Sequence, residues 1–233
     1  MPERDLRTVV RDRIWMLDRP VWFSGVRLRA NTTVVRLDDG GLLLHSPAPP
    51  SDALVEQLRA LGPVRWLVVP NCFHHLGAPA AAARFPEARV VGPQSALRRN
   101  EALRVHVDLH GAEFGERLPE FEVLPLQGVP FLDETVLYHR PTQTLLGADI
   151  VLRADAKDHW TWRWAARITG CYDRVRVPPD VRRTIPDKAA AARSIRAMLD
   201  RPARRLLVGH ADVVEEGCLD RLAEAWRLEG VEV

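Results

Sequence analysis

The sequence is poor in cysteine and has no long apolar stretch. Its three cysteines are widely spaced, odd in number and form no CxxC pair, which excludes a disulfide framework and indicates a reduced, cytoplasmic setting. No apolar run approaches the roughly 20 residues of a bilayer-spanning helix. The charged amino terminus, residues 1–5, lacks the apolar core of a signal peptide. We therefore expect a soluble intracellular protein with no membrane partner.

An excess of charge of one sign is also missing. The 33 basic and 31 acidic residues leave a formal net charge of +2, which gives no reason to expect nucleic acid or an anionic membrane as the main partner. Only two of the basic residues are lysines, and we interpret the predominance of arginine as compositional bias of the source genome. A small-molecule substrate is the expected partner, and the oligomeric state is left open.

Hydrophobic content and length are ordinary for a globular protein. The chain is 46% hydrophobic and 27% charged, as folded domains are, and 233 residues suffice to bury a large core. It contains no low-complexity linker and no repeat of solenoid period. We expect a single domain over residues 1–233.

A pattern of hairpin, helix and strand occurs once in each half. In the first half, strands over 32–37 and 42–45 flank an Asp-Gly turn, a helix starts at Ser51 or Asp52, and a buried strand covers 64–69. The second half offers a hairpin of 134–138 with 144–150, a helix from Asp187 to Leu199 and a strand over 205–209. This order predicts layered sheets with helices outside. Further expected elements are strands at 14–17 and 21–28 interrupted at Arg19-Pro20, a strand at 88–91, helices at 79–84, 159–168 and 215–228, a helical turn at 94–99, and β-structure with loops over 104–126.

Three of the apolar runs end in residues that bind metals or transfer protons. Residues 66–69 lead into a turn with Asn71, Cys72, His74 and His75; residues 144–148 lead into Asp149, and residues 205–209 into His210. Sites in α/β proteins collect at the carboxyl ends of strands. We therefore expect a cluster with the members His74, His75, Asp149 and His210.

The order of these features resembles the metallo-β-lactamase-like superfamily. The hairpin sequence over 39–46 is similar to its first motif, although His45 stands where an acidic residue is usual. The second motif, His-x-His-x-Asp-His followed after one residue by Gly, aligns on His75-Leu76-Gly77. The resemblance makes Asp149 the bridging aspartate and Gly209-His210 the late Gly-His pair. It implies an α+β fold, a four-layer αββα sandwich of two mixed β-sheets flanked by helices.

The chain departs from the superfamily pattern in a consistent way. The positions that hold one metal in the superfamily are here Pro70, Cys72 and the neighbourhood of Val129, which carries no histidine. The resemblance places the other metal at His74, His75, Asp149 and His210. The chain thus resembles a divergent branch with an incomplete motif set that keeps one metal site in altered form.

The implied ligand set suits one divalent cation. Three imidazoles and a carboxylate can bind zinc, which is the expected ion, or iron or manganese. Four protein ligands make a closed structural site, whereas catalysis needs an open position for water. With an open position, the site predicts a hydrolase of an ester, lactone, amide or phosphodiester, with Asp149 and His74 as catalytic candidates.

Each candidate residue also has a simpler interpretation. Two adjacent histidines can point in opposite directions, Asp149 can be a turn residue, and His210 a loop residue. Cys72 is expected to be a buried filler, Asn71 to cap its turn, and His45 to end a strand. His106, His110 and His139 are expected to be exposed. Trp160, Trp162 and Trp164 are expected to pack in the core, with lining of a substrate cleft as the alternative, and the arginines at 174, 176, 182 and 183 to lie in a solvated loop.

Two functions remain open from the sequence. A mononuclear metal-dependent hydrolase is favoured by metal-competent residues at all four positions of the second site. A degenerate, non-catalytic protein that binds a ligand or partner, with no metal, is favoured by the loss of the first site. Nucleic-acid binding ranks third.

Overall fold

Two β-sheets form the centre of the molecule, described over residues 6–233 in a computed structural model. Within those residues, the larger sheet has seven strands in chain order: β1 (Arg7–Val10), β2 (Ile14–Phe23), β3 (Val26–Arg36), β4 (Leu42–His45), β5 (Val64–Val68), β6 (Arg89–Gly92) and β7 (Val107–Asp108). β1 to β4 pair antiparallel, and β4 to β7 pair parallel. The amino-terminal residues 1–5, assigned above to a charged terminus, lie outside the described part.

The smaller sheet is built by the second half of the chain. Its four strands over the described residues are β8 (Phe121–Pro125), β9 (Thr135–His139), β10 (Thr144–Leu146) and β11 (Arg205–Leu207), in the order β11-β10-β9-β8. β9 and β10 form a hairpin, and β11 pairs parallel to β10. The first half has the same arrangement, because β3 and β4 form a hairpin and β5 is parallel to β4.

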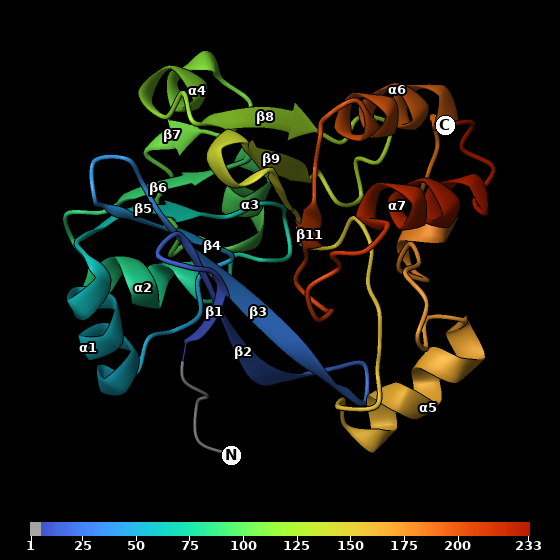
Figure 1. The fold of residues 1–233 in the computed structure, drawn as a ribbon, viewed down its shortest axis with the longest axis horizontal. Coiled ribbons are helices and arrows are strands. Elements are labelled where there is room, and N and C mark those ends of the chain that lie inside the picture. Colours follow the sequence, from blue (N-terminus) through green and yellow to red (C-terminus); the bar gives the residue numbers. More distant parts are fainter. Residues whose placement is uncertain (1–5) are drawn as a thin grey trace.

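Helices cover the outer face of each sheet, which gives four layers (Figure 1). The larger sheet carries α1 (Asp52–Leu61), α2 (Ala78–Arg84) and α3 (Gln94–Arg99), and the smaller carries α6 (Lys188–Leu199) and α7 (Cys218–Arg227). A separate apolar layer that includes Val35, Val68, Leu137 and Leu146 lies between the two sheets. The prediction of an α+β fold with an αββα sandwich is confirmed.

Local sequence explains most element boundaries. Ser51 caps α1, with its hydroxyl accepting a hydrogen bond from the Leu54 amide, and Asp187 caps α6 in the same way through the Ala190 amide. Gly40, with φ of 81°, makes the turn between β3 and β4. The limits of α1 and α6 are close to those predicted, whereas β3 begins at Val26, well before the predicted start at residue 32.

Two sequence predictions of structure were wrong. Arg19-Pro20 does not interrupt a strand, because β2 runs through it, and the strand expected over 21–28 is instead divided by the turn between β2 and β3. β1 pairs only with Ile14–Met16 of β2, so Pro20 needs no partner on that side. The segment expected to be only β-structure and loops contains the helix α4 (Ala112–Arg117). Its interior Gly115 and short length hide the helical pattern.

Two predictions of burial were also wrong. Trp160 and Trp164 on α5 (Trp160–Thr169) are about two-thirds exposed, and only Trp162 of the three is buried. His139, expected to be exposed, is fully buried and lies 3.2 Å from Glu120 through its Nε2. His139 is the last residue of β9 and lies under the loop before β8, a position that the sequence pattern does not reveal. Among residues 6–233, no helix combines the length and apolar character needed to span a bilayer.

Candidate metal centre

Three of the four expected site residues lie together at one edge of the sandwich. Nε2 of His74 lies 3.2 Å from one carboxylate oxygen of Asp149, and Nε2 of His210 lies 3.4 Å from the other. One ligand atom from each of the three residues falls within 4.8 Å of the other two. Their side chains are 8–14% exposed, so the cluster is sheltered but reaches solvent.

The fold brings these residues together as expected from strand ends. His74 lies in the turn after β5, Asp149 follows β10 and His210 follows β11. β10 and β11 are parallel neighbours, so residues beyond their carboxyl ends meet at one edge.

His74 is held from behind by a serine and by its own turn. Its Nδ1 forms a hydrogen bond with the Ser46 hydroxyl, just after β4. The Asn71 side-chain oxygen accepts hydrogen bonds from the amides of Phe73 and His74, so the expected capping role of Asn71 is observed. Both contacts fix the ring with Nε2 directed to Asp149.

Asp149 is positioned by a buried glutamate. The Glu134 carboxylate accepts hydrogen bonds from the amides of Ala148, Asp149 and Ile150 and from the Asn71 side-chain amide. The same Asn71 amide donates to Asp149 at 2.8 Å. Glu134 therefore shapes the loop that presents Asp149.

The two carboxyl groups respond to their surroundings in opposite directions. Burial, together with the charge of Asp149, raises the pKa of Glu134 to about 7, although its hydrogen bonds act the other way. Burial alone would also raise the pKa of Asp149, but His74 and His210 outweigh it and hold that pKa well below its usual range. Asp149 is thus the anionic member of the pair.

The protonation of one ring nitrogen of His210, Nδ1, is fixed by its hydrogen bond. Its Nδ1 lies 2.6 Å from the carbonyl oxygen of Arg29, which can only accept, so Nδ1 carries a proton. The loop is anchored by Asn31, whose side-chain amide donates to the carbonyls of Val208 and Ala211. Burial lowers the pKa of His210, but the contact with Asp149 more than compensates and raises it overall.

Gly209 is required by the packing of His74. A Cβ atom at this position would lie 2.5 Å from Cε1 of the His74 ring. The glycine before His210 therefore makes room for the ring of His74, which explains the Gly-His pair physically.

His75 does not join the cluster. Its Nδ1 lies 3.2 Å from the Asn100 side-chain nitrogen, and its ring is 7% exposed. The adjacent histidines have different partners, Ser46 and Asp149 for His74 and Asn100 for His75. Gly77 fixes this turn, because a Cβ there would lie 2.1 Å from the carbonyl oxygen of Pro47. The glycine that anchored the alignment thus serves backbone packing, and three cluster members remain.

The positions matching the other superfamily metal site are occupied by packing contacts. The carbonyl of Pro70 accepts from the Thr135 amide, and the Cys72 thiol donates to the carbonyl of Phe131 at 3.2 Å. Val129 is buried in the core beneath α6. Burial raises the pKa of Cys72, so its thiol stays protonated, as expected for a filler.

The geometry and the donor chemistry of the cluster fit a divalent metal. Two ligands about 2.0 Å from a tetrahedral zinc ion are about 3.3 Å apart, and each imidazole Nε2 lies at a comparable distance, 3.2 or 3.4 Å, from a different oxygen of the Asp149 carboxylate. A neutral His210, protonated on Nδ1, presents the lone pair of Nε2 to a carboxylate. These atoms repel each other unless a cation, either a proton or a metal, lies between them.

Sequence reasoning missed the supporting residues. Glu134, Ser46 and the Arg29 carbonyl carry no motif signal, because their contacts with the cluster exist only in three dimensions. His45 is buried with no partner for Nε2, and burial followed by the charge of His74 lowers its pKa to about 3. Arg29 also pairs with Asp155 and Asp158, which ties β3 to the chain after Asp149.

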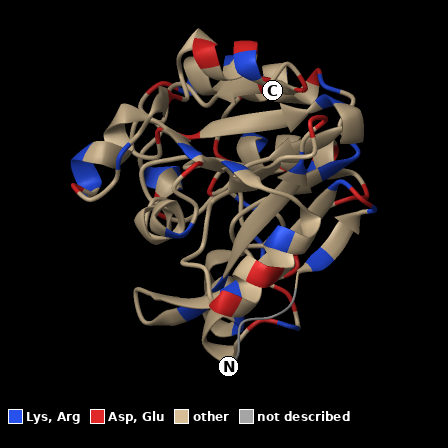
Figure 2. Ribbon diagram, turned by 90° about the vertical axis from the view of Figure 1, so that its left-hand side faces the viewer, with Lys and Arg blue, Asp and Glu red and all other residues tan. Residues whose placement is uncertain are grey.

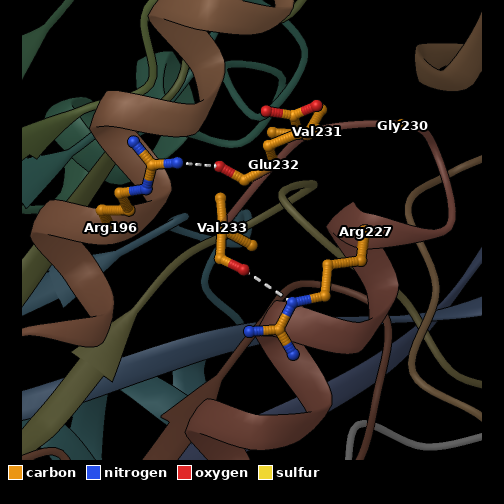
Figure 3. Close-up of a pocket in the computed structure, with 6 residues that line it drawn as sticks. All are labelled: Arg196, Arg227, Gly230, Val231, Glu232 and Val233. Carbon is orange, nitrogen blue, oxygen red and sulfur yellow. Dashed lines mark hydrogen bonds between the residues drawn. The ribbon is translucent and has the colours of Figure 1, made fainter.

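A separate cavity of about 360 Å³ lies between α6, α7 and the carboxyl-terminal residues (Figure 3). None of the cluster residues lines it. Its two arginines are engaged by the chain itself, since Arg196 donates to the carbonyl of Glu232 and Arg227 to Val233. We assign no function to this cavity.

The sequence comparisons indicate no function, whereas the structural comparisons reported below agree on one fold. A family described as a domain of unknown function, DUF4336, matches residues 11–96. No match is found among curated proteins.

Solved structures match over almost the whole chain. A metallo-β-lactamase from Erythrobacter litoralis is 14% identical, with a TM-score of 0.69 and 96% of each chain covered. The metallo-β-lactamase FIM-1 from Pseudomonas aeruginosa, in its mono-zinc form, is 13% identical, with a TM-score of 0.67 and coverage of 100% of this chain and 98% of the other. A metallo-β-lactamase from Pontibacter korlensis is 14% identical, with a TM-score of 0.65 and coverage of 96% and 98%. At such identities the likeness concerns the fold, and by it the chain has the metallo-β-lactamase-like fold.

Proposed function

We propose that the protein is a metal-dependent hydrolase with one metal site, formed by His74, Asp149 and His210, that acts on an ester, lactone, amide or phosphodiester. The observation that carries this proposal is that one ligand atom from each of these three residues lies within 4.8 Å of the other two. Zinc is the ion we propose first, because two neutral imidazoles and a carboxylate suit it.

The departure of His75 from the cluster favours catalysis over a purely structural site. Three protein ligands leave a tetrahedral ion one open position, whereas four would close it. An ion held in this way lowers the pKa of a coordinated water toward ~7 and polarises a substrate carbonyl or phosphoryl oxygen.

The chain's own residues supply orientation and charge. The Arg29 carbonyl and the Ser46 hydroxyl keep both Nε2 atoms directed at the site. Asn71 donates a hydrogen bond to the Asp149 carboxylate, and Glu134 accepts one from the Asp149 backbone amide. Because Asp149 stays ionised, one of its carboxylate oxygens would hold the ion and the other could accept a hydrogen bond from an attacking water, while His74 would serve as a ligand through Nε2.

A ligand-binding protein without catalytic activity is the second candidate. The observation that favours it is the filling of the other superfamily site by Pro70, Cys72 and Val129, which are committed to packing. In this alternative His210 is an imidazolium paired with Asp149, and no metal is bound.

Metal analysis of purified variants tests the proposal. We expect the wild-type protein, loaded with zinc and dialysed, to retain about one equivalent. His74→Ala and His210→Ala should lose it. His75→Ala is the matched control, since it alters the neighbouring histidine outside the cluster, and it should retain the metal.

Activity is measured in parallel on a panel of aryl esters, lactones and bis-aryl phosphodiesters. Hydrolysis that disappears with His210→Ala and persists in His75→Ala supports the enzyme. Absence of stoichiometric metal in the wild-type protein rejects it and favours the binding protein. The free, buried state of all three cysteines supports our further proposal that the protein works in the cytoplasm.

A further inference from the structure

Exposed aromatic side chains gather at one corner of the molecule. α5 presents Trp160, Trp164 and Ile168 at a spacing of four residues, and the tip of the β2–β3 hairpin presents Trp22 and Phe23. Each is 57–67% exposed. We call these five residues the aromatic platform. Only two other large apolar side chains of the described residues, Leu76 and Leu228, are comparably exposed. Exposed apolar side chains are therefore concentrated in the platform and are not spread evenly over the surface.

The platform is a preformed surface. The Arg27 amide donates to the Thr161 hydroxyl, joining β3 to α5. The rings of Trp22 and Trp160 both lie within about 6 Å of the His159 ring, between centroids. Beneath them, Trp162 and Ala166 pack with Leu28 and Leu152 in a small core. Figure 1 shows α5 and the hairpin tip together at the lower corner, away from the other helices.

Positive charge is concentrated around this platform. Residues 18–29 and 150–176, which contain it, carry nine of the 33 basic residues and four of the 31 acidic ones. The rest of the chain therefore has more acidic than basic residues. By contrast, the face that carries α1 and α2 has both signs interspersed (Figure 2). The small overall charge thus conceals two segments with an excess of basic residues, of which Arg29 and Lys157 are paired with carboxylates.

Basic side chains occur on α5 itself and just beyond it. Arg163 and Arg167 are the charged residues of the helix, and Arg167 lies over the Tyr172 ring at 3.7 Å from its centroid. Arg174 is exposed in the following loop. A second copy of the chain would bring arginines against arginines across a two-fold axis, which is unfavourable.

We propose that the aromatic platform docks the protein on an anionic lipid bilayer. Indole rings prefer the boundary between headgroups and acyl chains, and arginines around them are attracted by anionic headgroups. The helix α5 would lie in the plane of the interface with Trp160, Trp164 and Ile168 directed into it. This inference does not rest on the proposed hydrolysis, and it replaces the expectation from net charge that the protein has no membrane partner.

Vesicle co-sedimentation tests the proposal on the full-length protein. The probes are vesicles of phosphatidylcholine alone and vesicles of roughly three parts phosphatidylcholine to one part phosphatidylglycerol. We expect binding to the anionic vesicles only, weakening as salt is raised. Trp160→Ser/Trp164→Ser should weaken binding by about tenfold or more, and Arg174→Glu should weaken it less.

Two controls make the result specific. Leu228→Ser removes an exposed apolar side chain of α7, outside the platform, and should leave binding unchanged. Circular dichroism and urea unfolding establish that the double tryptophan variant folds. In vesicles with brominated acyl chains, tryptophan fluorescence should be quenched in the wild-type protein and much less in that variant.

Several results would overturn the proposal. Equal binding to both vesicle types, no binding to either, or unchanged binding by the folded tryptophan variant would each do so. A dimer seen by light scattering that dissociates in Trp160→Ser/Trp164→Ser would assign the platform to a second copy. Binding to an oligothymidine strand that is lost in the same variant, without vesicle binding, would assign it to single-stranded nucleic acid.

Discussion

The edge of the sandwich that carries the candidate site has two parts. The first, the cluster side, contains His74, Asp149 and His210, and the second, the filled side, contains Pro70, Cys72 and Val129. On the cluster side, a hydrogen bond from a neighbouring segment holds each residue from behind: Ser46 at the His74 ring, Glu134 at the Asp149 backbone amide and the Arg29 carbonyl at the His210 ring. On the filled side, Pro70, Cys72 and Val129 contact the core and direct no ligand atom outward. The comparison indicates that a metal centre needs residues that orient its ligands by hydrogen bonds as much as it needs the ligands themselves.

The largest effect on the cluster side is expected from a substitution of Glu134. Glu134→Ala leaves three backbone amides and the Asn71 amide without their acceptor in a buried position, so we expect a loss of about 3–5 kcal/mol in the free energy of unfolding. Urea unfolding at neutral pH measures it.

A matched control exists on the surface. Glu113→Ala removes an exposed carboxylate that pairs with Arg89 and Arg117, and it should change stability by less than about 0.5 kcal/mol. Equal effects of the two substitutions would contradict the positioning role of Glu134.

Gly209→Ala should damage metal binding more than stability. Its new methyl group would lie in the space of the His74 ring, so we expect zinc affinity to fall by about 10- to 100-fold. Competition with a chromogenic chelator measures the affinity.

Gly115→Ala is the control, because a Cβ atom there meets nothing within 4 Å and φ is not positive. It lies in α4 and should raise stability slightly, by about 0.5–1 kcal/mol. Unchanged zinc affinity in Gly209→Ala would show that the ring of His74 is not a ligand held by this contact.

A pH test is offered by His45, which is buried at the end of β4 next to Ser46. Burial holds its pKa at about 3, below the ordinary value, so the folded state favours the neutral ring. Between pH 6.5 and about 3, His45 binds a proton in the unfolded chain but not in the folded protein. Its contribution to the free energy of unfolding is therefore complete above pH 6.5 and decreases as the pH falls through this range. At pH 5 the loss from this residue is about 2 kcal/mol.

The measurement compares urea unfolding at pH 7 and pH 5 for the wild-type protein and His45→Leu. The variant should lose less stability on acidification. His139, whose pKa burial lowers to about 4, contributes in the same direction and remains in both proteins. An identical pH dependence of the two proteins would refute the assignment to His45.

The smallest effect is expected on the filled side. Cys72→Ala removes one buried sulfur and its hydrogen bond to Phe131, which should cost about 1 kcal/mol of stability. Metal content should not change. Loss of zinc in this variant would show that the two sides are not independent.

The sequence predicted the layers better than the site. Patterns that are local, such as the Ser51 and Asp187 caps and the turn at Gly40, predicted their elements because short-range chemistry determines them. The meeting of Asp149 and His210 was predictable from strand ends, because β10 and β11 are parallel.

Other features could not be predicted, because they depend on packing between distant segments. Adjacent histidines differ in role through the turn that Gly77 and Pro47 force, which the motif alignment does not contain. Glu134 is one glutamate among many until β9 places it under the Asp149 loop. The tryptophans of α5 follow a helical period, but the period does not say which face another element covers.

The amide of Asn71 touches groups from three strand ends, since it bonds its own turn, Glu134 and Asp149. These segments are separated by 63 and 78 residues along the chain, and they meet only after the two sheets have docked. Because these contacts join segments far apart in the chain, we expect the ion-binding geometry to form late in folding. Metal would bind the finished protein alone, so it would protect that state by mass action without guiding the chain toward it.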